Sequence, residues 1–320
     1  MTALACDLGG RRIKLGVVRG GRVLAADVLP AHADQPLPDR LEAVAGALER
    51  LCARLGLGIR DCAGVGISYP SIIDTDRARI LDHFGKFGDA SEFDLRGWAW
   101  RALGLPLAID NDARMALIGE WRYGAGRGSD NLVMITLGTG LGVSAVIEGR
   151  VLRGAHGQAG ILGGHITVRQ GGRPCVCGNI GCAEAEASTS VLGPLAEALP
   201  GFPTSLLASE RMLDYAAIFR LAAQGDPCSR TLREHSLEVW SALAVSLIHA
   251  YDPDRLIFGG GVMGAADVIL PPVRDYVARH AHTPWGKVQV VASELGDQAA
   301  LLACEWLVEE MVHGEKESVT

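Results

Sequence analysis

The sequence lacks three features that would point to other classes of protein. Its apolar runs stop short of the about 18 residues that a membrane span needs. The N-terminus, MTALACDLGG, has no basic segment followed by a long apolar stretch, so we expect no signal peptide and a cytoplasmic location. A net charge of −7 at pH 7 gives no positive field that would attract nucleic acid. We therefore expect neither a membrane nor a nucleic acid as a partner.

Length and composition predict a globular chain with two subdomains. With 320 residues, the chain is longer than one hydrophobic core usually supports. Hydrophobic residues make up 48% and charged residues 21% of the sequence, which is close to ordinary globular composition. Glycine is in excess, at 41 of 320 residues, or about 13% against a typical ~7%. We expect this excess to lie in tight turns.

Four metal-binding side chains lie close together in one segment. His165, Cys175, Cys177 and Cys182 form a His-x9-Cys-x-Cys-x4-Cys pattern typical of tetrahedral Cys3His zinc sites. Four such ligands leave no open position, so the zinc is expected to be structural. The alternatives are unrelated buried cysteines, which usually lie in apolar runs, and a redox Cys-x-Cys, which the third thiol disfavours. The remaining cysteines are expected to be reduced core residues: Cys6, Cys52, Cys62, Cys228 and Cys304.

The spacing of apolar residues predicts alternating strands and helices, as in α/β proteins. Short apolar runs between turn residues predict strands at 3–8, 13–18, 22–28, 63–68, 105–110, 132–137, 141–147, 255–260 and 288–293. Helical spacing predicts helices at 39–55, 113–123, 232–250, 265–281 and 297–312. The polar stretch 74–97 is expected to be rich in loops.

The opening strands have a counterpart later in the chain. Residues 132–152 repeat the order of 3–24: a strand, a glycine-rich turn, a second strand, and then Gly-Arg-Val-Leu. The spacing from Leu8 to Gly21 is 13 positions, and the spacing from Leu137 to Gly149 is 12. We interpret the repeat as an internal duplication. The alternative is coincidence, because hairpins with glycine turns are common.

The glycine-rich turns suit phosphate groups, because backbone N–H groups without bulky side chains can approach phosphate oxygens. The two turns are Gly9-Gly10-Arg11-Arg12 and Gly138-Thr139-Gly140. Asp7 precedes the first turn, and an acid beside a phosphate site indicates Mg²⁺ between them. The alternative is an Asp that caps the turn. Gly259-Gly260-Gly261 closes another strand before a helix, where backbone can also approach a ligand closely.

Asn111 and Asp112 lie where a predicted strand runs directly into a helix. An Asp at such a junction can cap the helix and stabilise its dipole. The same position holds a carboxylate rigidly, so that it could accept a proton from a hydroxyl group attacking a γ-phosphate. Asp112 is therefore a candidate general base for phosphoryl transfer.

Taken in order, these motifs resemble those of the ROK family (repressors, open reading frames and kinases) over nearly the whole chain. The segment from Asp7 to Arg12 resembles the family's first phosphate motif, Gly138 to Gly142 the second, and the triple glycine its adenosine motif. The resemblance implies a duplicated actin-like and hexokinase-like α/β fold of the ribonuclease H-like kind, with a cleft between two subdomains. We place these at 1–122 and 123–320, with the C-terminal helix packing back on the first.

The resemblance also implies an ATP-dependent sugar kinase that uses Mg²⁺ and contains a structural Zn²⁺. Asp112 would deprotonate a hydroxyl of a hexose or hexose-like sugar and help to bind it. Asn111 and Glu184 would bind further hydroxyls, and His165 would bind both the sugar and the zinc. Family members suggest a homodimer or homotetramer.

Three departures from the family pattern affect the expected substrate. Arg11 stands where the family usually has Thr, and Tyr69 stands where a small residue often faces the sugar. In the family's Gly-Glu-x-Gly-His motif, the apolar pair Ile161-Leu162 replaces the sugar-contacting Glu. The sequence therefore leaves open which sugar is used. The alternatives are a catalytically silent relative that binds sugar or nucleotide, and a sugar-responsive regulator, whose N-terminal DNA-binding module would have no room before residue 9.

Overall fold

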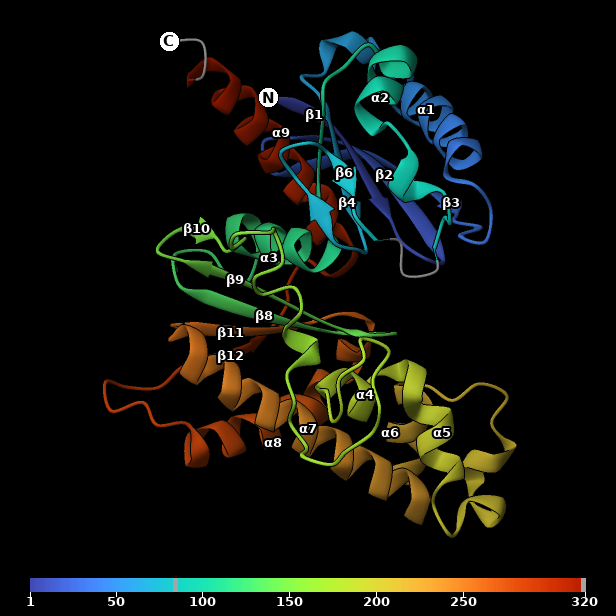
Figure 1. Cartoon of the computed structure of the whole chain (residues 1–320), viewed down its shortest axis with the longest axis vertical. Helices are drawn as coiled ribbons and strands as arrows, with labels where there is room; N and C mark the ends of the chain where they lie inside the picture. Colours follow the sequence, from blue (N-terminus) through green and yellow to red (C-terminus); the bar gives the residue numbers. More distant parts are fainter. Residues whose placement is uncertain (83–85, 318–320) are drawn as a thin grey trace. The chain divides into compact units, whose positions relative to one another are not determined.

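The computed structural model describes residues 1–82 and 86–317 and divides into two compact units (Figure 1). Unit 1 comprises Met1–Arg127, Arg153–Ala159 and Asp297–Thr320, and unit 2 comprises Gly128–Leu152 and Gly160–Gly296. Each unit is built around one five-stranded sheet and has its own hydrophobic core.

The sheet of unit 1 has the strand order β3-β2-β1-β4-β7. Its strands are β1 (Thr2–Leu8), β2 (Arg12–Arg19), β3 (Arg22–Pro30), β4 (Val65–Tyr69) and β7 (Leu107–Asn111). The first three form an antiparallel meander, and β4 and β7 continue the sheet in parallel beside β1. Parallel strands are covered on both faces, which is why β4 is buried along its whole length.

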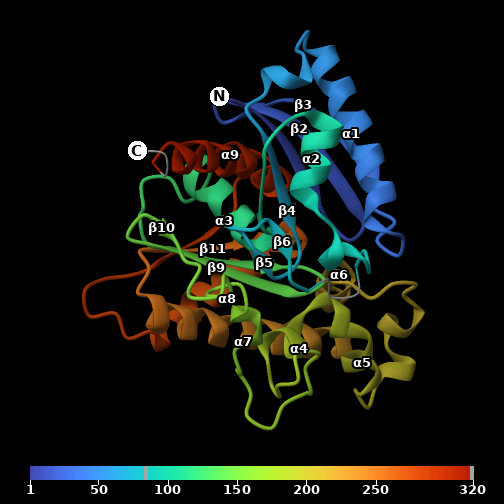
Figure 2. The ribbon, with the colours of Figure 1, turned by 45° about the horizontal axis from the view of Figure 1, so that its top comes forward.

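Helices cover both faces of this sheet (Figure 2). On one face lie α1 (Leu37–Arg54) and α2 (Leu95–Leu103), and on the other lie α3 (Asp112–Tyr123) and α9 (Ala299–Glu317). The buried Glu305 of α9 accepts hydrogen bonds from the backbone N–H groups of Gly20 and Gly21 at 2.6 and 2.7 Å. This carboxylate fixes the β2–β3 turn to α9. A small hairpin pairs β5 (Ile73–Asp74) with β6 (Arg79–Ile80).

The sheet of unit 2 repeats the arrangement, with the order β10-β9-β8-β11-β12. Its strands are β8 (Leu132–Leu137), β9 (Leu141–Ile147), β10 (Arg150–Val151), β11 (Arg255–Gly259) and β12 (Gln289–Ala292). Again an antiparallel meander is continued by two parallel strands. The predicted duplication of the opening meander is confirmed.

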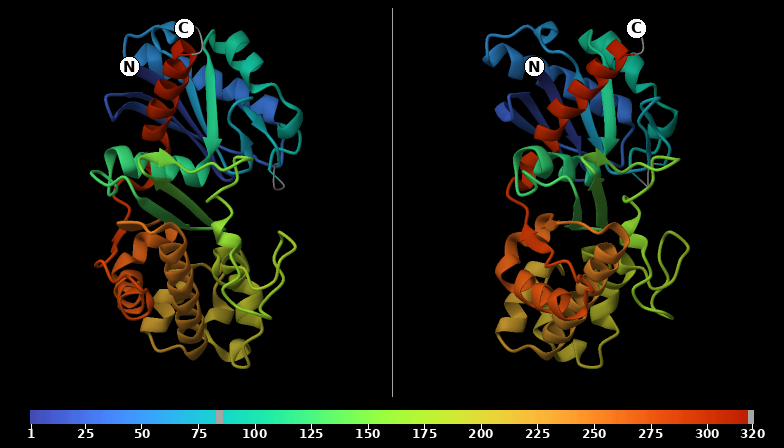
Figure 3. Two further views of the ribbon diagram at one scale, coloured as in Figure 1. Left: turned by 60° about the vertical axis from the view of Figure 1, so that its left-hand side comes forward. Right: turned by 90° about the vertical axis from the view of Figure 1, so that its left-hand side faces the viewer.

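The helices of unit 2 gather on one side of its sheet (Figure 3). They are α4 (Ala183–Ala187), α5 (Leu192–Glu197), α6 (Tyr215–Ala223), α7 (Pro227–Tyr251) and α8 (Ala266–His280). The long helix α7 packs against β8, and α8 packs against β12. None of the helices in the described part of the chain is long and apolar enough to cross a membrane.

The predicted strands and the long helices are present, but several short helices were missed. The stretch 74–97, predicted to be loop, also contains β6 and the first residues of α2. Signals for α2 were present: Asp94 caps its first turn by accepting from Gly97 N, and Gly104 ends it with a φ of 67°. The helices α4 and α5 are too short for a hydrophobic period to mark them.

Candidate active site

Asp7 lies near the end of β1, immediately before the first glycine-rich turn. Ser68 Oγ donates to Asp7 Oδ1 at 2.8 Å, and Lys14 Nζ lies 3.4 Å from Oδ2. Lys14 faces Asp7 directly in the β1–β2 register and also pairs with Asp297 at 2.8 Å. The carboxylate is therefore held by side chains of the neighbouring strands and takes no part in closing the turn that follows it.

The first turn, from Gly9 to Arg12, is exposed over its last three residues. Gly9 N donates to the carbonyl oxygen of Asp7 at 3.1 Å. The Arg12 guanidinium lies 3.6 Å from the exposed Asp297 carboxylate, and exposed pairs of this kind contribute at most about 1 kcal/mol. The turn thus combines an exposed glycine with two arginine side chains, which suits phosphate oxygens.

Asn111 is the N-cap of α3. Its Oδ1 accepts from the N–H groups of Ala113 and Arg114 at 3.0 and 3.2 Å. Its Nδ2 donates to the carbonyl oxygen of Ser71 at 2.9 Å and to Asp112 Oδ1 at 3.2 Å. Both the oxygen and the NH₂ group of the amide thus form hydrogen bonds within the protein. One of these bonds is to Asp112, so in this structure Asn111 orients Asp112.

Asp112, the first residue of α3, is half-buried. Its Oδ1 accepts from Ala113 N at 2.8 Å and from the Asn111 amide, so the bonds from the described residues leave Oδ2 for another partner. Burial and the nearby charge of Asp7 raise the pKa of Asp112, and Lys86 and the Ala113 N–H act in the opposite direction. A fixed carboxylate with a raised pKa is suited to general-base catalysis.

A buried ion cluster lies directly before this pair. Asp110 is fully buried and contacts the guanidinium of Arg114, which is 1% exposed. Arg153 Nη2 binds the other carboxylate oxygen at 2.6 Å, and Arg114 Nη2 donates to the carbonyl oxygen of Gly157 at 2.8 Å. The cluster fixes the end of β7 and the segment Arg153–Ala159 within unit 1. The sequence prediction missed it, because Arg153 is distant along the chain.

The second glycine-rich turn lies between β8 and β9 in unit 2. Gly138 N donates to the Gly140 carbonyl oxygen at 3.0 Å, and Thr189 N and Ser190 N donate to the carbonyl oxygens of Gly138 and Thr139. These bonds use carbonyl groups and fix the shape of the turn.

Glu184, predicted to bind a sugar hydroxyl, contacts this second turn. Its Oε2 accepts a hydrogen bond from Leu141 N at 2.9 Å. A Cβ atom added at Gly140 would lie 2.4 Å from the same carboxylate oxygen, so a side chain there would displace the Glu184 carboxylate. Glu184 thus connects α4 with the residue that follows the second turn.

The triple glycine lies beside the second turn. Gly260 has a φ of 90°, and a Cβ atom on it would lie 2.2 Å from the carbonyl oxygen of Leu137. A side chain is therefore excluded at Gly260 by both conformation and space. Gly261 has no such neighbour and begins a short 3₁₀ helix before α8. The predicted second phosphate motif and the predicted adenosine motif are thus adjacent in unit 2.

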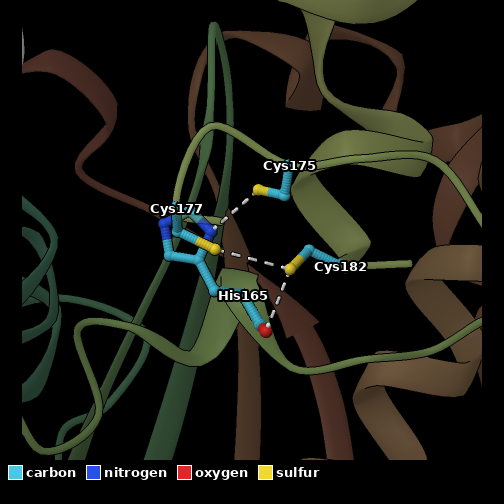
Figure 4. Close-up of side chains that lie close together, drawn as sticks. All are labelled: His165, Cys175, Cys177 and Cys182. Carbon is cyan, nitrogen blue, oxygen red and sulfur yellow. Dashed lines mark hydrogen bonds between the residues drawn. The ribbon is translucent and has the colours of Figure 1, made fainter. Parts of the chain in front are cut away.

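His165, Cys175, Cys177 and Cys182 point toward one another (Figure 4), with their ligand atoms all within 4.8 Å. Cys177 Sγ lies 3.7 Å from Cys182 Sγ, and Cys175 Sγ lies 3.4 Å from His165 Nδ1. A tetrahedral zinc ion with ordinary bond lengths requires separations of about 3.8 Å between sulfurs and about 3.6 Å between sulfur and nitrogen. The four side chains therefore fit one zinc ion, and the sulfur separation excludes a disulfide, which needs about 2.05 Å.

Glu186 anchors the loop that carries the cysteines, and the sequence prediction missed it. The side chain is 1% exposed. Its Oε1 accepts from Arg173 N at 2.6 Å, and its Oε2 lies 3.4 Å from His235 Nε2 and 3.7 Å from Arg169. The carboxylate thus ties the loop to α4 and α7. The signal was an acidic residue in a run of alanines, where burial requires a partner.

The segment before His165, in which Ile161 and Leu162 replace the Glu of the family motif, packs on β9. Ile161 is 8% exposed, whereas Leu162 is 37% exposed. A Cβ atom on Gly163 would lie 2.6 Å from Val143, and one on Gly164 would lie 1.9 Å from the carbonyl oxygen of Leu141. The two glycines therefore let the short helix that ends at His165 lie directly on β9.

The structure assigns the predicted site residues to both units. Asp7, the first turn, Asn111 and Asp112 belong to unit 1. Unit 2 contains the second turn, the triple glycine, Glu184 and the four candidate zinc ligands. Sequence-distant residues come together inside each unit, such as Asp7 with Ser68, and Glu184 with Leu141.

Two α/β sheets with the same strand order, each with a glycine-rich turn after its first strand, define the duplicated actin-like and hexokinase-like class of proteins. The chain belongs to the ROK family, whose profile matches residues 3–311. The fold class and the family predicted from the sequence are thereby confirmed.

Solved structures and relatives agree with this assignment. A ROK hexokinase from Thermus thermophilus superimposes with a TM-score of 0.80 at 31% identity, covering 98% of this chain and 100% of that chain. A ROK family glucokinase from Streptomyces griseus, in complex with glucose and AMPPNP, gives a TM-score of 0.77 at 30% identity, covering 97% and 100%. A glucokinase of Halalkalibacterium halodurans is 30% identical over 95% of this chain and 94% of its own length.

The chain is also similar to a repressor. A xylose repressor of Bacillus subtilis is 26% identical over 77% of this chain, and the match covers 60% of the repressor.

Proposed function

We propose that the protein is an ATP-dependent sugar kinase that transfers the γ-phosphate of ATP to a hydroxyl group of a hexose or hexose-like sugar. The observation that carries the proposal is the Asp112 carboxylate, which is fixed through Oδ1 and has a raised pKa. The exposed residues of the first turn lie in the same unit. The glucokinases and the hexokinase that resemble this chain support the assignment.

In the proposed reaction, the sugar hydroxyl gives its proton to Asp112 Oδ2 while its oxygen forms a bond to the γ-phosphorus. The bond between that phosphorus and the β–γ bridging oxygen breaks, and ADP leaves with the electron pair. Asn111 and the Ala113 N–H hold Oδ1 throughout. A carboxylate whose pKa lies above its ordinary value is the stronger base, and fixing it in advance lowers the entropic cost of reaching the transition state.

The proposed ATP contacts are backbone groups of three glycine-rich segments. Gly9 to Arg12 in unit 1 and Gly138 to Gly140 in unit 2 would contact phosphates, and Gly259 to Gly261 would contact the adenosine. Mg²⁺ commonly uses one or two carboxylates together with phosphate and water oxygens, and Asp7 is a carboxylate of this kind beside the first turn. When bound, the ion would neutralise phosphate charge.

The zinc would act on the structure of unit 2. His165, Cys175, Cys177 and Cys182 would hold it as a closed four-ligand site, which leaves no position for a substrate. Because α4 begins directly after Cys182, the ion would also fix the position of Glu184 against Leu141 N. We therefore propose that the zinc supports the second phosphate turn as well as His165.

Metal analysis of the purified protein is expected to give about one zinc per chain. The variant Cys182→Ser should lose the zinc and show a higher KM for ATP, because Glu184 would no longer be held beside the second turn. The control variant Cys228→Ala removes a buried thiol outside the cluster and should retain the metal. A zinc-free protein that is well folded and fully active would contradict the proposed role of the metal.

The sugar is expected to differ from that of relatives with the full family motif, because Ile161 and Leu162 cannot accept the hydroxyl hydrogen bonds of a Glu. Asp112, Asn111, His165 and Glu184 remain the proposed sugar contacts. Phosphotransfer from ATP should be assayed across hexoses, amino sugars and ketoses, with product expected for at least one of them. The absence of product with every sugar, despite nucleotide binding by calorimetry, would favour a catalytically silent binding protein.

A second candidate function is sugar-responsive regulation, which the similarity to the xylose repressor favours. The match covers only part of that repressor. A regulatory function predicts that sugar binding alters the affinity of the protein for an operator DNA. Titration of the protein with DNA, with and without sugar, distinguishes the two functions. The homodimer or homotetramer expected from the family stays a prediction for light scattering.

A further inference from the structure

The Lys86 side chain lies between two parts of the proposed active site in unit 1. A methyl group placed on Gly10 of the first turn would lie 3.2 Å from Lys86 Cε and 3.9 Å from its Nζ. The same ammonium group acts electrostatically on Asp112 and favours its ionised form, which lowers the pKa of that carboxyl. Lys86 is therefore near both the phosphate turn and the proposed base.

The backbone at Lys86 is held by buried aromatic residues. Phe87 is fully buried and donates its N–H to the Ala33 carbonyl oxygen at 2.7 Å. Tyr69, also fully buried, packs its ring 6.2 Å from that of Phe87 and donates its hydroxyl to the Lys86 carbonyl oxygen at 3.3 Å. Tyr69, expected from the sequence to face the sugar, instead supports the residue before Phe87.

Phe87 also has an uncommon backbone conformation, with a φ of 48°. A bulky side chain in the left-handed region costs on the order of 1–3 kcal/mol, and such strain persists only where the surrounding structure imposes it. Here the packing of Tyr69 and the bond to Ala33 supply that constraint. The backbone next to Lys86 is therefore held in one conformation by its surroundings.

Lys86 makes no close ion pair with a carboxylate of the described residues, and Asp112 acts on it only at longer range. Lys14 pairs with Asp7 and Asp297, whereas among residues 1–82 and 86–317 no ion pair within 4.0 Å involves Lys86. The side chain is half-buried. A partly desolvated cation beside a phosphate-binding turn is suited to binding an anion.

We propose that Lys86 is a catalytic residue that contacts the phosphoryl group during its transfer from ATP to the sugar. The inference rests on the proposed kinase function. In the transition state, negative charge is spread over the equatorial oxygens of the phosphoryl group. Lys86 keeps its proton and stabilises these oxygens, while Asp112 takes the proton of the sugar hydroxyl and ADP leaves with the electron pair of the broken bond.

The test compares wild type with Lys86→Met, which keeps the length of the side chain but removes its charge. Lys86→Met is expected to lower kcat by about 100-fold, the lower end of the loss when one transition-state donor is removed. The KM for the sugar should change less than about twofold, since the group acts mainly in the transition state. Lys86→Arg keeps the charge and should recover part of the activity. Lys287→Met, in an exposed loop of unit 2, is the control and should match wild type.

The pH profile separates a direct charge effect from a structural one. The charged groups acting on Asp112 are Asp7 and Lys86, and removing Lys86 takes away the one that favours ionisation. The acid limb of kcat/KM should therefore move to higher pH in Lys86→Met and stay in place in Lys287→Met. Thermal unfolding should show that both variants are folded.

Each outcome has a distinct meaning. If wild type phosphorylates a sugar and Lys86→Met has the same kcat and the same acid limb, the role of Lys86 is refuted and the kinase proposal stands. If folded wild type phosphorylates no sugar in the panel, the proposed function fails, and the role of Lys86 fails with it.

Discussion

Replacing Asp112 by Asn is expected to lower kcat by about 10²–10⁴-fold, the usual contribution of general-base catalysis. The amide cannot accept the proton of the sugar hydroxyl, although its oxygen can still take the bonds that Ala113 N and Asn111 make to Oδ1. The measurement is steady-state phosphotransfer with the best sugar of the panel. Equal turnover by Asp112→Asn and wild type would show that Asp112 is not the base.

The fold of this variant should be intact. A carboxyl whose pKa is raised in the folded state reduces stability at every pH above its pKa in the unfolded chain. A neutral amide removes that cost, so the melting temperature should be unchanged or higher near neutral pH. The control is Asp39→Asn, which changes an exposed acid in the first turn of α1; it should leave activity unchanged and lower stability by at most about 1 kcal/mol.

The pH dependence of wild type follows from the same shift. Because the base must be ionised, kcat/KM should fall as the pH drops through the pKa of Asp112. That pKa lies above the ordinary Asp value of about 3.9 because of burial and Asp7. The acid limb should therefore lie at higher pH than for an unperturbed Asp. An acid limb at or below the ordinary value would contradict the raised pKa.

The parts of the site that the sequence could predict are those formed by neighbours along the chain. The candidate zinc ligands lie between His165 and Cys182, and the junction of β7 and α3 carries both Asn111 and Asp112. Backbone periodicity and turn residues are local properties, so the two meanders could also be recognised.

The sequence could not predict which groups each side chain contacts inside the protein, because these contacts depend on the tertiary fold. Asn111 is proposed to bind a sugar, but its contact within the protein could not be foreseen: the register of β4 and β7 and the turn after β4 place the Ser71 carbonyl oxygen against its amide. The hydroxyl of Tyr69 reaches the Lys86 backbone because the fold brings residue 86 close to the end of β4. A single apolar or polar residue in a sequence does not indicate which of these distant groups it will contact.

The largest expected effect on stability comes from Asp110→Asn. Its carboxylate pairs with the fully buried Arg114 and with Arg153, which is 31% exposed. The variant leaves two guanidinium groups side by side, with one unable to reach water. Removing one partner of a buried ion pair typically costs about 3–5 kcal/mol. Chemical denaturation, combined with hydrogen exchange of the amides in β7 and α3, measures the loss in unit 1.

A control variant compares this buried ion pair with an exposed one in its effect on the free energy of unfolding. Arg77→Ala breaks the pair of Arg77 with Asp74, in which the Arg side chain is 78% exposed, and exposed pairs contribute at most about 1 kcal/mol. If Asp110→Asn also lowers the free energy of unfolding by less than about 1 kcal/mol, the result contradicts the prediction. It would mean that Arg114, which is 1% exposed, finds water or another partner.

The same substitution should also affect catalysis, because Asp110 Oδ1 accepts the N–H of Asn111 at 2.7 Å. Asn111 in turn orients Asp112, so a loosened end of β7 would misplace the base while leaving its chemistry unchanged. Asp110→Asn should therefore lower kcat without moving the acid limb, unlike Lys86→Met. This difference in pH profile distinguishes Asp110, which fixes the position of the base, from Lys86, whose charge acts on the base.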